Sequence, residues 1–279
     1  MRTWLITGAS RGFGARIAGL ALERGENVVA TARTPESIVE QFGRRSNLLA
    51  VALDVTDPQQ AEAAVAAAVS RFGQIDVLLN NAGYGLVGAV EEVSGEEVER
   101  LYRTNVFGLL NVTRAVLPVM RAARSGRIIN ISSIGGYRAA AGFGVYCSTK
   151  FAVEGLSEAM HAELAPLGIH VTVVEPGYFR TDFLDASSLA VSPTSIADYN
   201  ATAGAVRSRA AGLNHAQPGD PERLAQVLVD LANAADPPVR LPLGSDTVAA
   251  IQAKHAADGA ILQQWHSVSV STDFPHADR

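Results

Sequence analysis

The 279-residue sequence predicts an α/β protein with a doubly wound Rossmann fold, in which helices cover both faces of an about seven-stranded parallel sheet. Short runs rich in Val, Ile and Leu alternate with longer helical patterns along the chain. The short runs are continuously apolar, as expected of strands that are buried on both faces. Repeated strand–helix–strand units imply right-handed crossovers between parallel strands.

Each predicted element has a local signal. Asp57-Pro58 predicts a helix start, because Asp caps the first turn and Pro is tolerated there, and Gly73 predicts the end of that helix. Asp220-Pro221 predicts a second such start, for a helix that continues to about residue 235. The predicted strands are Thr3–Thr7, Asn27–Ala32, Leu48–Leu53, Ile75–Leu79, Gly126–Ile131, His170–Val174 and, as a seventh, Val239–Leu243.

We expect residues 1–245 to form a single catalytic domain. An irregular segment at about 178–218 follows a strand end, where ligands bind in open α/β sheets, so it is a candidate substrate lid. The alternative interpretation is a mobile surface excursion. Residues 246–279 are expected to form a helix near Asp246–Gln264 followed by a polar tail.

Composition argues against several classes of partner. The formal net charge is −5 and no run of Lys or Arg is present, so nucleic acid and anionic membranes are not expected partners. The single cysteine, Cys147, excludes an intramolecular disulfide, and no residue cluster has metal-ligand spacing. The first apolar run ends at Gly8 and no stretch approaches the roughly 18 to 20 apolar residues of a spanning helix. We therefore expect a cytoplasmic protein without a metal.

The first predicted strand runs directly into a glycine-rich turn, Thr7–Gly14, with the spacing Gly-x-x-x-Gly-x-Gly. Glycines let backbone N–H groups approach an anion, and the N-terminus of the following helix favours a pyrophosphate. The spacing differs from the Gly-x-Gly-x-x-Gly fingerprint, but strand, turn and helix occur in the required order. In preference to a merely structural turn, we predict a nucleotide site that includes Gly8, Ser10, Arg11, Gly12, Phe13 and Gly14.

The end of the second predicted strand indicates which nucleotide binds. An acidic residue there would accept hydrogen bonds from a ribose 2′-hydroxyl and repel a 2′-phosphate. This chain has Ala32 followed by Arg33, and Arg11 lies in the glycine turn. Two guanidinium groups suit a phosphate, so we predict NADP(H) in preference to NAD(H). The alternative is that one or both arginines are solvated surface charges.

Tyr146 and Lys150 lie four residues apart in a segment with a helical pattern. Side chains at this spacing share one face of a helix. An ammonium group beside a phenol favours its ionised form, which lowers the phenol pKa from its usual value of about 10. The pair is therefore a candidate acid and base, with the Ser133 hydroxyl as a candidate third member. Because the spacing also occurs by chance in amphipathic helices, this interpretation depends on the other motifs.

Taken together, these motifs resemble the short-chain dehydrogenase/reductase family in its single-domain form, over about residues 1–245. The segment around Tyr146 is most similar to the branch of 17β-hydroxysteroid and retinol dehydrogenases. The resemblance implies further cofactor-binding residues: Asp54 and Val55 after the third strand, with Asp54 at the adenine; Asn81, Ala82 and Gly83 after the fourth; Tyr146 and Lys150; and Pro176, Gly177, Phe179 and Thr181 after the sixth.

The resemblance also implies four catalytic residues: Asn105, Ser133, Tyr146 and Lys150. Tyr146 would exchange a proton with the substrate oxygen, Lys150 would lower the Tyr146 pKa and hold the nicotinamide ribose, and Asn105 would hold a water of a proton relay. An Asn in mid-helix competes for backbone hydrogen bonds, so we expect a helix irregularity at Asn105.

The implied function is an NADP(H)-dependent oxidoreductase that interconverts a carbonyl and an alcohol. A hydrophobic ketone, aldehyde or secondary alcohol is expected because apolar residues cluster near the chemistry: Tyr137, Phe143, Tyr178, Phe179, Phe183 and Leu184. The alternatives are a non-catalytic NADP(H)-binding regulator and an epimerase or dehydratase on the same fold. Helices around 96–124 and 144–167 are expected to pair in a homodimer or homotetramer, although the C-terminal Val-Asp-Gly-Gly common in the family is absent.

Overall fold

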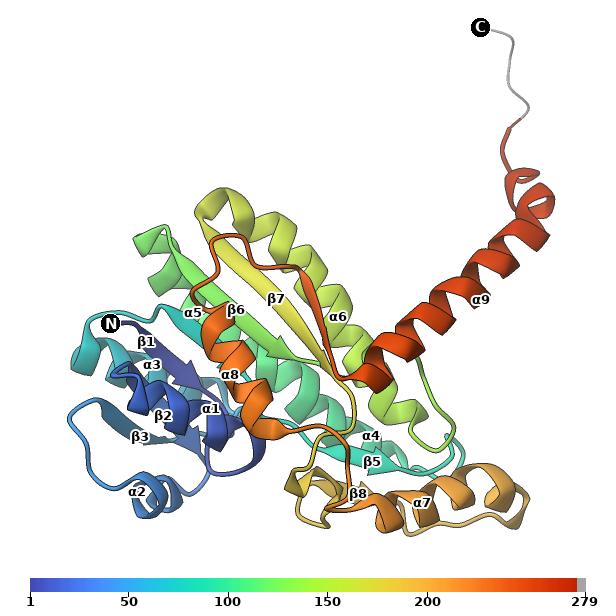
Figure 1. Ribbon diagram of the computed structural model, residues 1–279, viewed down its shortest axis with the longest axis horizontal. Helices are drawn as coiled ribbons and strands as arrows, with labels where there is room; N and C mark the ends of the chain where they lie inside the picture. The colour runs from blue at the N-terminus through green and yellow to red at the C-terminus, as the bar shows by residue number, and fades with distance from the viewer. Residues whose placement is uncertain (275–279) are drawn as a thin grey trace, which may run out of the picture.

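A seven-stranded parallel sheet runs through the protein and confirms the predicted fold class (Figure 1). The computed structural model describes residues 1–274. The strand order is β3-β2-β1-β4-β6-β7-β9, so the direction of winding reverses between β1 and β4. The strands are β1 (Thr3–Ile6), β2 (Asn27–Ala32), β3 (Leu48–Ala52), β4 (Val77–Asn80), β6 (Gly126–Ile131), β7 (Ile169–Pro176) and β9 (Arg240–Leu243). The β2 and β6 bounds match the prediction, whereas β4 begins two residues later and β7 extends further.

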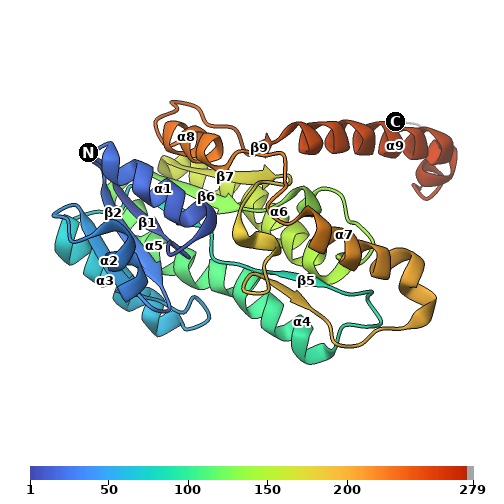
Figure 2. The same cartoon turned by 60° about the horizontal axis from the view of Figure 1, so that its bottom comes forward.

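Helices cover both faces of the sheet (Figure 2). On one face, α1 (Gly12–Glu23), α2 (Glu36–Phe42) and α8 (Pro221–Leu231) enclose a core that includes Ile17 and Leu228. On the other face, α3 (Pro58–Phe72), α5 (Leu109–Ala123) and α6 (Gly144–Leu164) enclose a second core around Val116 and Met160. Because both faces are buried, the strand sequences are continuously apolar.

The predicted helix caps are confirmed. The Asp57 side chain accepts hydrogen bonds from the Gln59 and Gln60 backbone N–H groups at the start of α3. Gly73 ends that helix in the left-handed conformation, with a φ of 81°. The Asp220 side chain caps α8 in the same way, although α8 ends at Leu231 and does not continue to about residue 235. Caps are local interactions between neighbouring residues, and the sequence therefore reveals them.

One helical run, Gly95–Ala123, consists of α4 (Gly95–Tyr102), a π-helical turn at Arg103–Gly108 and α5. The π turn contains Asn105, which confirms the predicted helix irregularity. By length and composition alone this run could cross a membrane, with a mean hydropathy of 1.3, contrary to the sequence expectation. In the fold, α5 packs against α3 and against β4 and β6, as a core helix does.

The segment at 178–218 is more regular than its sequence suggests. It contains β8 (Leu189–Val191), which pairs with β5 (Gly85–Val87) in a second, two-stranded sheet, and helix α7 (Ala205–Leu213). Both short strands were absent from the prediction. Glu92, which is 2% exposed, fastens the segment to the body. It accepts hydrogen bonds from the Ile196 backbone at 2.9 Å and from Arg207 at 2.6 Å.

Helix α9 (Ser245–Val270) extends away from the body of the protein, as Figures 1 and 2 show. Its first residues are tied to the domain, where the Asp246 carboxylate accepts a hydrogen bond from the Tyr178 backbone at 2.8 Å. The helix is longer than predicted, and its outer half exposes Ile261, Leu262 and Trp265. Residues 275–279 of the predicted polar tail lie outside the described residues.

Candidate active site

A cleft of about 990 Å³ lies at the carboxyl ends of the central strands. Residues after β1, β4, β6 and β7 line it, and the 178–218 segment contributes a wall. This is the position at which open α/β sheets bind ligands, beside the reversal of strand order. Of the predicted cofactor-binding and catalytic residues, only Gly14 and Asn105 are not part of the lining, and both lie directly behind it.

The glycine turn forms a cradle with the shape that a pyrophosphate requires. Gly8 and Gly12 have φ values of 66° and 57°, which side-chain-bearing residues rarely adopt. Helix α1 begins at Gly12 without a side-chain cap, so its first N–H groups are available to an anion. A Cβ atom on Gly14 would lie 2.3 Å from the Gly8 carbonyl oxygen, so close packing permits only glycine there. The turn therefore fits a dinucleotide cofactor.

Asn81 supports this cradle from β4. Its side-chain amide donates hydrogen bonds to the carbonyl oxygens of Thr7 and Gly8, each at 3.0 Å. The Thr7 hydroxyl in turn accepts hydrogen bonds from the Asn81 and Ala82 backbones. Asn81 thus holds the glycine turn in shape and also lines the cleft.

The nucleotide end of the cleft carries two arginines. Arg33 follows β2, is exposed and lines the cleft. Arg11 donates a hydrogen bond of 2.6 Å to the Ser187 carbonyl oxygen, which links the glycine turn to the 178–218 segment. Asp54 also lines the cleft, and its carboxylate accepts hydrogen bonds from the Thr56 backbone and hydroxyl at 2.9 and 2.8 Å. The Asp54 carboxylate therefore stabilises its own turn.

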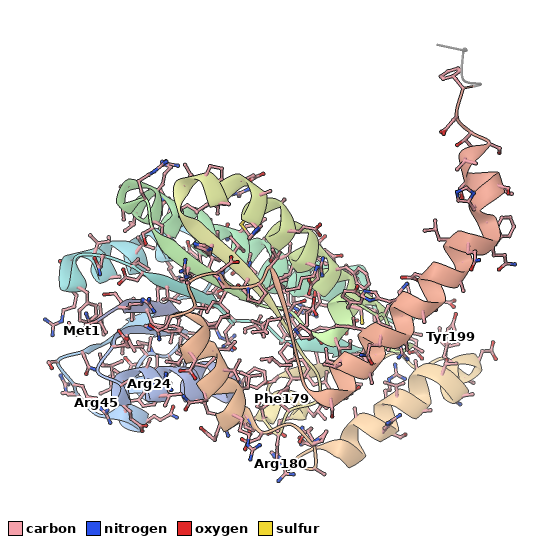
Figure 3. All side chains as sticks on the ribbon, turned by 45° about the horizontal axis from the view of Figure 1, so that its top comes forward. Met1, Arg24, Arg45, Phe179, Arg180 and Tyr199 are labelled. Carbon is pink, nitrogen blue, oxygen red and sulfur yellow. The ribbon has the colours of Figure 1, made fainter. Side chains whose placement is uncertain are left out.

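Phe179 lines the cleft where the chain leaves β7. Its ring meets the Phe13 ring edge-on, with the centroids 5.6 Å apart. Figure 3 shows Phe179 at the edge of the body and Arg180, the next residue of the 178–218 segment, on the outside of the protein. Thr181, 6% exposed, caps the short turn that follows by accepting a hydrogen bond from the Phe183 backbone. These contacts fix the segment that the resemblance assigned to cofactor binding.

Tyr146 lies on α6 and is only 7% exposed. The rings of Phe143 and Phe183 flank it, with centroid distances of 6.0 and 5.9 Å. Burial raises the Tyr146 pKa above its usual value, and interaction with the Ser133 hydroxyl opposes this rise. The expectation that a neighbouring ammonium lowers this pKa is thus not met in this structure, because desolvation of the phenol dominates.

Lys150 shares this face of α6, and its Nζ atom lies 5.8 Å from the centre of the Tyr146 ring. The ammonium donates a hydrogen bond of 2.9 Å to the Ile131 carbonyl oxygen at the end of β6. Burial lowers the Lys150 pKa to about 8, and the negative charge of Glu154 opposes this shift. Tyr146, Lys150 and Ser133 all line the cleft, so the structure brings the three residues together.

Asn105 supports the site from behind. Its amide group donates hydrogen bonds to the Tyr84 carbonyl oxygen at 2.9 Å and to the Thr149 hydroxyl at 3.2 Å. Its carbonyl oxygen accepts one from the Tyr84 backbone at 3.1 Å. These bonds connect the π turn to α6 and to the chain after β4. Both polar groups of the Asn105 side chain are therefore used to hold these elements together.

The sequence did not reveal two charged clusters. Glu154, one helical turn beyond Lys150, packs against Glu175 and Arg240 beneath the cleft. A second group, of two half-buried aspartates and an exposed histidine, brings ligand atoms of Asp182, Asp185 and His215 within 4.8 Å of one another, where His215 and Asp185 form an ion pair at 3.2 Å. Only the four-residue spacing from Lys150 to Glu154 could have indicated the first cluster.

Comparison with known proteins adds independent information. The family model described as short chain dehydrogenase matches residues 2–191. The oxidoreductase BOA17 of Botryotinia fuckeliana is 38% identical over 274 residues, which cover 97% of this chain and 99% of that protein. A 3-ketodihydrosphingosine reductase of Bacteroides thetaiotaomicron is 47% identical over 181 residues, or 65% of each chain.

Solved structures resemble this fold closely. A short-chain dehydrogenase from Streptomyces avermitilis superimposes with a TM-score of 0.89 at 39% identity, covering 98% of this chain and 100% of that one. ElxO with NADP bound gives 0.73 at 27% identity, covering 89% and 99%. A 3-ketoacyl-(acyl-carrier-protein) reductase from Brucella melitensis complexed with NADH gives 0.72 at 26% identity, covering 87% and 96%.

Proposed function

The chain belongs to the short-chain dehydrogenase family, an oxidoreductase family that uses NAD(P)(H), and we propose that it reduces a hydrophobic carbonyl compound with NADPH or catalyses the reverse oxidation. One observation carries this proposal. The Tyr146 and Lys150 side chains and the Ser133 hydroxyl face the same cleft as the glycine turn that fits a dinucleotide. The candidate proton-transfer groups and the cofactor cradle therefore line the same cleft.

Tyr146 acts as the general acid in the direction of reduction. Because burial raises its pKa, Tyr146 is a neutral phenol at neutral pH, which is the form that donates a proton to a substrate oxygen. The Ser133 hydroxyl donates a hydrogen bond to that oxygen as negative charge develops on it. When bound, the nicotinamide cofactor supplies the hydride. The residues of this chain supply position, proton and charge stabilisation.

Lys150 has two functions in this proposal. Its ammonium group would hydrogen-bond the ribose of a bound cofactor, and its positive charge would stabilise the phenolate that remains after Tyr146 has donated its proton. The Ile131 carbonyl oxygen accepts a hydrogen bond from the ammonium group and so fixes its place beside the cleft. Asn105 fixes the Thr149 hydroxyl, next to Lys150 on α6, and thereby supports the orientation of the helix.

The preference for NADPH rests on Arg33 and Arg11. Arg33 is free to meet a 2′-phosphate at the end of β2, where NAD-specific sites carry an acid. Arg11 lines the same cleft, and one of its guanidinium nitrogens donates a hydrogen bond to the Ser187 carbonyl oxygen. ElxO, a relative of known structure, has NADP bound. The charge balance of this end of the cleft supports the phosphorylated cofactor.

The substrate is proposed to be an apolar ketone or aldehyde. Phe143 and Phe183 form an aromatic wall on either side of Tyr146, and Leu184 and Ala190 extend the lining. An apolar substrate gains free energy by leaving water for such a surface, at roughly 25 cal/mol per Å². One relative is named as a 3-ketodihydrosphingosine reductase, which is consistent with a long apolar ketone.

Oxidation of NADPH in the presence of a panel of ketones and aldehydes tests the proposal. We expect consumption of NADPH, followed at 340 nm, to increase with the apolar length of the carbonyl compound. Tight NADPH binding without oxidation by any compound of the panel would instead favour the non-catalytic regulator. Product analysis by mass spectrometry distinguishes reduction from epimerisation, because only reduction adds two hydrogen atoms.

We also propose that the protein is a homo-oligomer. Phe107 in the π turn and Phe151 on α6 are 53% and 45% exposed, and they lie on the two helical runs expected to pair between subunits. Large exposed aromatic side chains are typical of interfaces. Size-exclusion chromatography with light scattering should give at least twice the 29.3 kDa mass of one chain. A mass of one chain at micromolar concentration would contradict this.

A further inference from the structure

One face of α6 carries a charged residue at every turn beyond Tyr146. Lys150, Glu154 and Glu158 follow it at successive intervals of four residues, which places them in one row along the helix. Tyr146 and Lys150 open into the cleft, whereas Glu158 is exposed. Glu154 lies between them and is only 3% exposed. Neither the glycine turn nor the proposed proton transfer accounts for a buried carboxylate at this position.

Glu154 belongs to a buried cluster assembled from three elements. The Arg240 guanidinium on β9 contacts Glu154 at 2.5 Å and Glu175 of β7 at 3.2 Å. Its other terminal nitrogen contacts Glu158 at 3.1 Å. Glu175 is 1% exposed. Two buried carboxylates therefore share a single guanidinium.

Aromatic and hydroxyl side chains lie around this cluster. The Tyr137 ring lies over the Arg240 guanidinium at 5.7 Å, and the Tyr137 hydroxyl is hydrogen-bonded to His255 of α9. Ser132 approaches from the end of β6. A Cβ atom on Gly136 would lie 2.5 Å from the Ser132 hydroxyl and 3.0 Å from Glu154 Cγ, so both side chains close over that glycine. Lys150 is the next cation along α6.

Ionising both buried carboxylates of the cluster at the same time is energetically unfavourable. One guanidinium balances one of them, and a second buried negative charge is unfavourable unless it is protonated. Burial accordingly raises the pKa of both Glu154 and Glu175. The Arg240 guanidinium lies closer to Glu154 than to Glu175, and burial raises the Glu154 pKa to about 7, so Glu154 is ionised in the pH range in which Lys150 titrates. Glu154 then presents a negative charge one turn below Lys150.

We propose that Glu154, clamped by Arg240 and backed by Glu175, is a positioning residue that keeps the buried Lys150 ammonium charged. Burial alone favours the neutral amine, and Lys150 is 7% exposed. A fixed anion on the same helix face opposes that effect. Glu154 would thus set the pH above which the cleft loses its positive charge. This inference rests on the proposed function, because the charge on Lys150 limits the pH range of the proposed reaction. The charge itself is a property of the ligand-free protein and can be measured without any substrate.

The sequence makes a direct test feasible, because the chain contains only two lysines, Lys150 and Lys254. Protein labelled with ¹³Cε-lysine should therefore give two Cε signals, which can be titrated separately by NMR. The Lys254→Arg variant assigns them, and Lys254, a half-exposed residue of α9 that pairs with Asp258, serves as an internal reference. We expect the wild-type Lys150 signal to titrate near pH 8.

Glu154→Gln should lower the Lys150 midpoint by about 1 pH unit, because a nearby opposite charge shifts a pKa by about 1 to 3 units and Arg240 offsets part of it. Glu158→Gln is the matched control, since it removes an exposed Arg240 partner and should change the midpoint by less than about 0.3 unit. Glu175→Gln leaves the Glu154 anion in place and should not lower the midpoint.

An unchanged Lys150 midpoint in Glu154→Gln would overturn the proposal, as would an equal fall in Glu158→Gln or Glu175→Gln. Glu154→Asp keeps the charge and separates electrostatics from packing. It should stay within about 0.5 unit of wild type, because a carboxylate remains beside Arg240. If Glu154→Gln does not fold, Glu154→Asp still tests the proposal. A fall of a full pH unit in the Lys150 midpoint, despite the retained charge, would contradict the role assigned to Glu154.

Discussion

Replacement of Tyr146 by Phe removes one oxygen atom from the proposed proton donor and little else. The ring is 7% exposed and lies between Phe143 and Phe183, so a phenylalanine will occupy the same volume. The lost interaction with Ser133 should cost about 1 kcal/mol of unfolding free energy. For a chain of this size such a loss lowers the melting temperature by about 2 to 4 °C. The variant should therefore remain folded.

The effect on catalysis should be much larger. A positioned general acid contributes a factor of roughly 10² to 10⁴, so kcat should fall by at least about 100-fold, equivalent to about 2.7 kcal/mol of activation free energy. NADPH binding should change by less than about threefold, because the phosphate cradle and Arg33 lie at other parts of the cleft. The large loss in kcat with an intact cofactor site distinguishes a proton donor from a structural residue.

Steady-state NADPH oxidation with the best carbonyl compound gives kcat, and the fluorescence of bound NADPH gives the dissociation constant. Tyr102→Phe is a matched control. The Tyr102 hydroxyl lies outside the cleft and donates a hydrogen bond of 2.9 Å to Ser148 on α6, the helix that carries Tyr146. The variant that lacks this hydroxyl should retain wild-type activity. Retention of more than a tenth of wild-type turnover in Tyr146→Phe would refute its assignment as the proton donor.

Three further predictions concern the cofactor and pH. Arg33→Ala should weaken NADPH binding by about 10- to 100-fold and leave NADH binding nearly unchanged, because a charge-assisted hydrogen bond is worth about 1.5 to 3 kcal/mol. Equal effects on both cofactors would remove the argument for phosphate recognition. Gly14→Ala should abolish NADPH fluorescence enhancement, since its Cβ would lie 2.3 Å from the Gly8 carbonyl oxygen, whereas Gly155→Ala, with no atom within 4 Å, should bind normally. In the direction of reduction, kcat/KM should be constant below about pH 8 and fall above it, because Lys150 is charged only below its pKa of about 8; an increase between pH 8 and 10 would contradict this.

The parts of the fold that could be predicted from the sequence depend on local signals. The strands are continuously apolar because both of their faces are buried, and Asp57 and Asp220 cap helices through residues two or three positions away. The glycine turn and the Tyr146–Lys150 pair could be predicted for the same reason, since their spacing is fixed within one turn or one helix face. The irregularity at Asn105 was also predicted, although its side chain bonds to Tyr84 and Thr149 and not to the backbone of its own helix.

Other features depend on tertiary contacts between distant residues. Strands β5 and β8 are three residues long, and each exists only because it pairs with the other across about 100 residues of sequence. The raised pKa of Tyr146 results from Phe143, Phe183 and the rest of its enclosure, which the four-residue spacing to Lys150 does not reveal. Likewise Arg240 reaches Glu154 from β9, and a Glu on a helix usually faces solvent.

Transfer of deuterium from C4-deuterated NADPH to an apolar ketone tests the proposed reaction most directly. With protein, NADPH labelled on the transferred face and the ketone in one vessel, we expect the alcohol product to carry one deuterium on its carbinol carbon. We also expect this product to be absent when Tyr146→Phe replaces the wild-type protein over the same time. An alcohol without deuterium, or no alcohol from any ketone or aldehyde despite bound NADPH, would contradict hydride transfer as the function of this cleft.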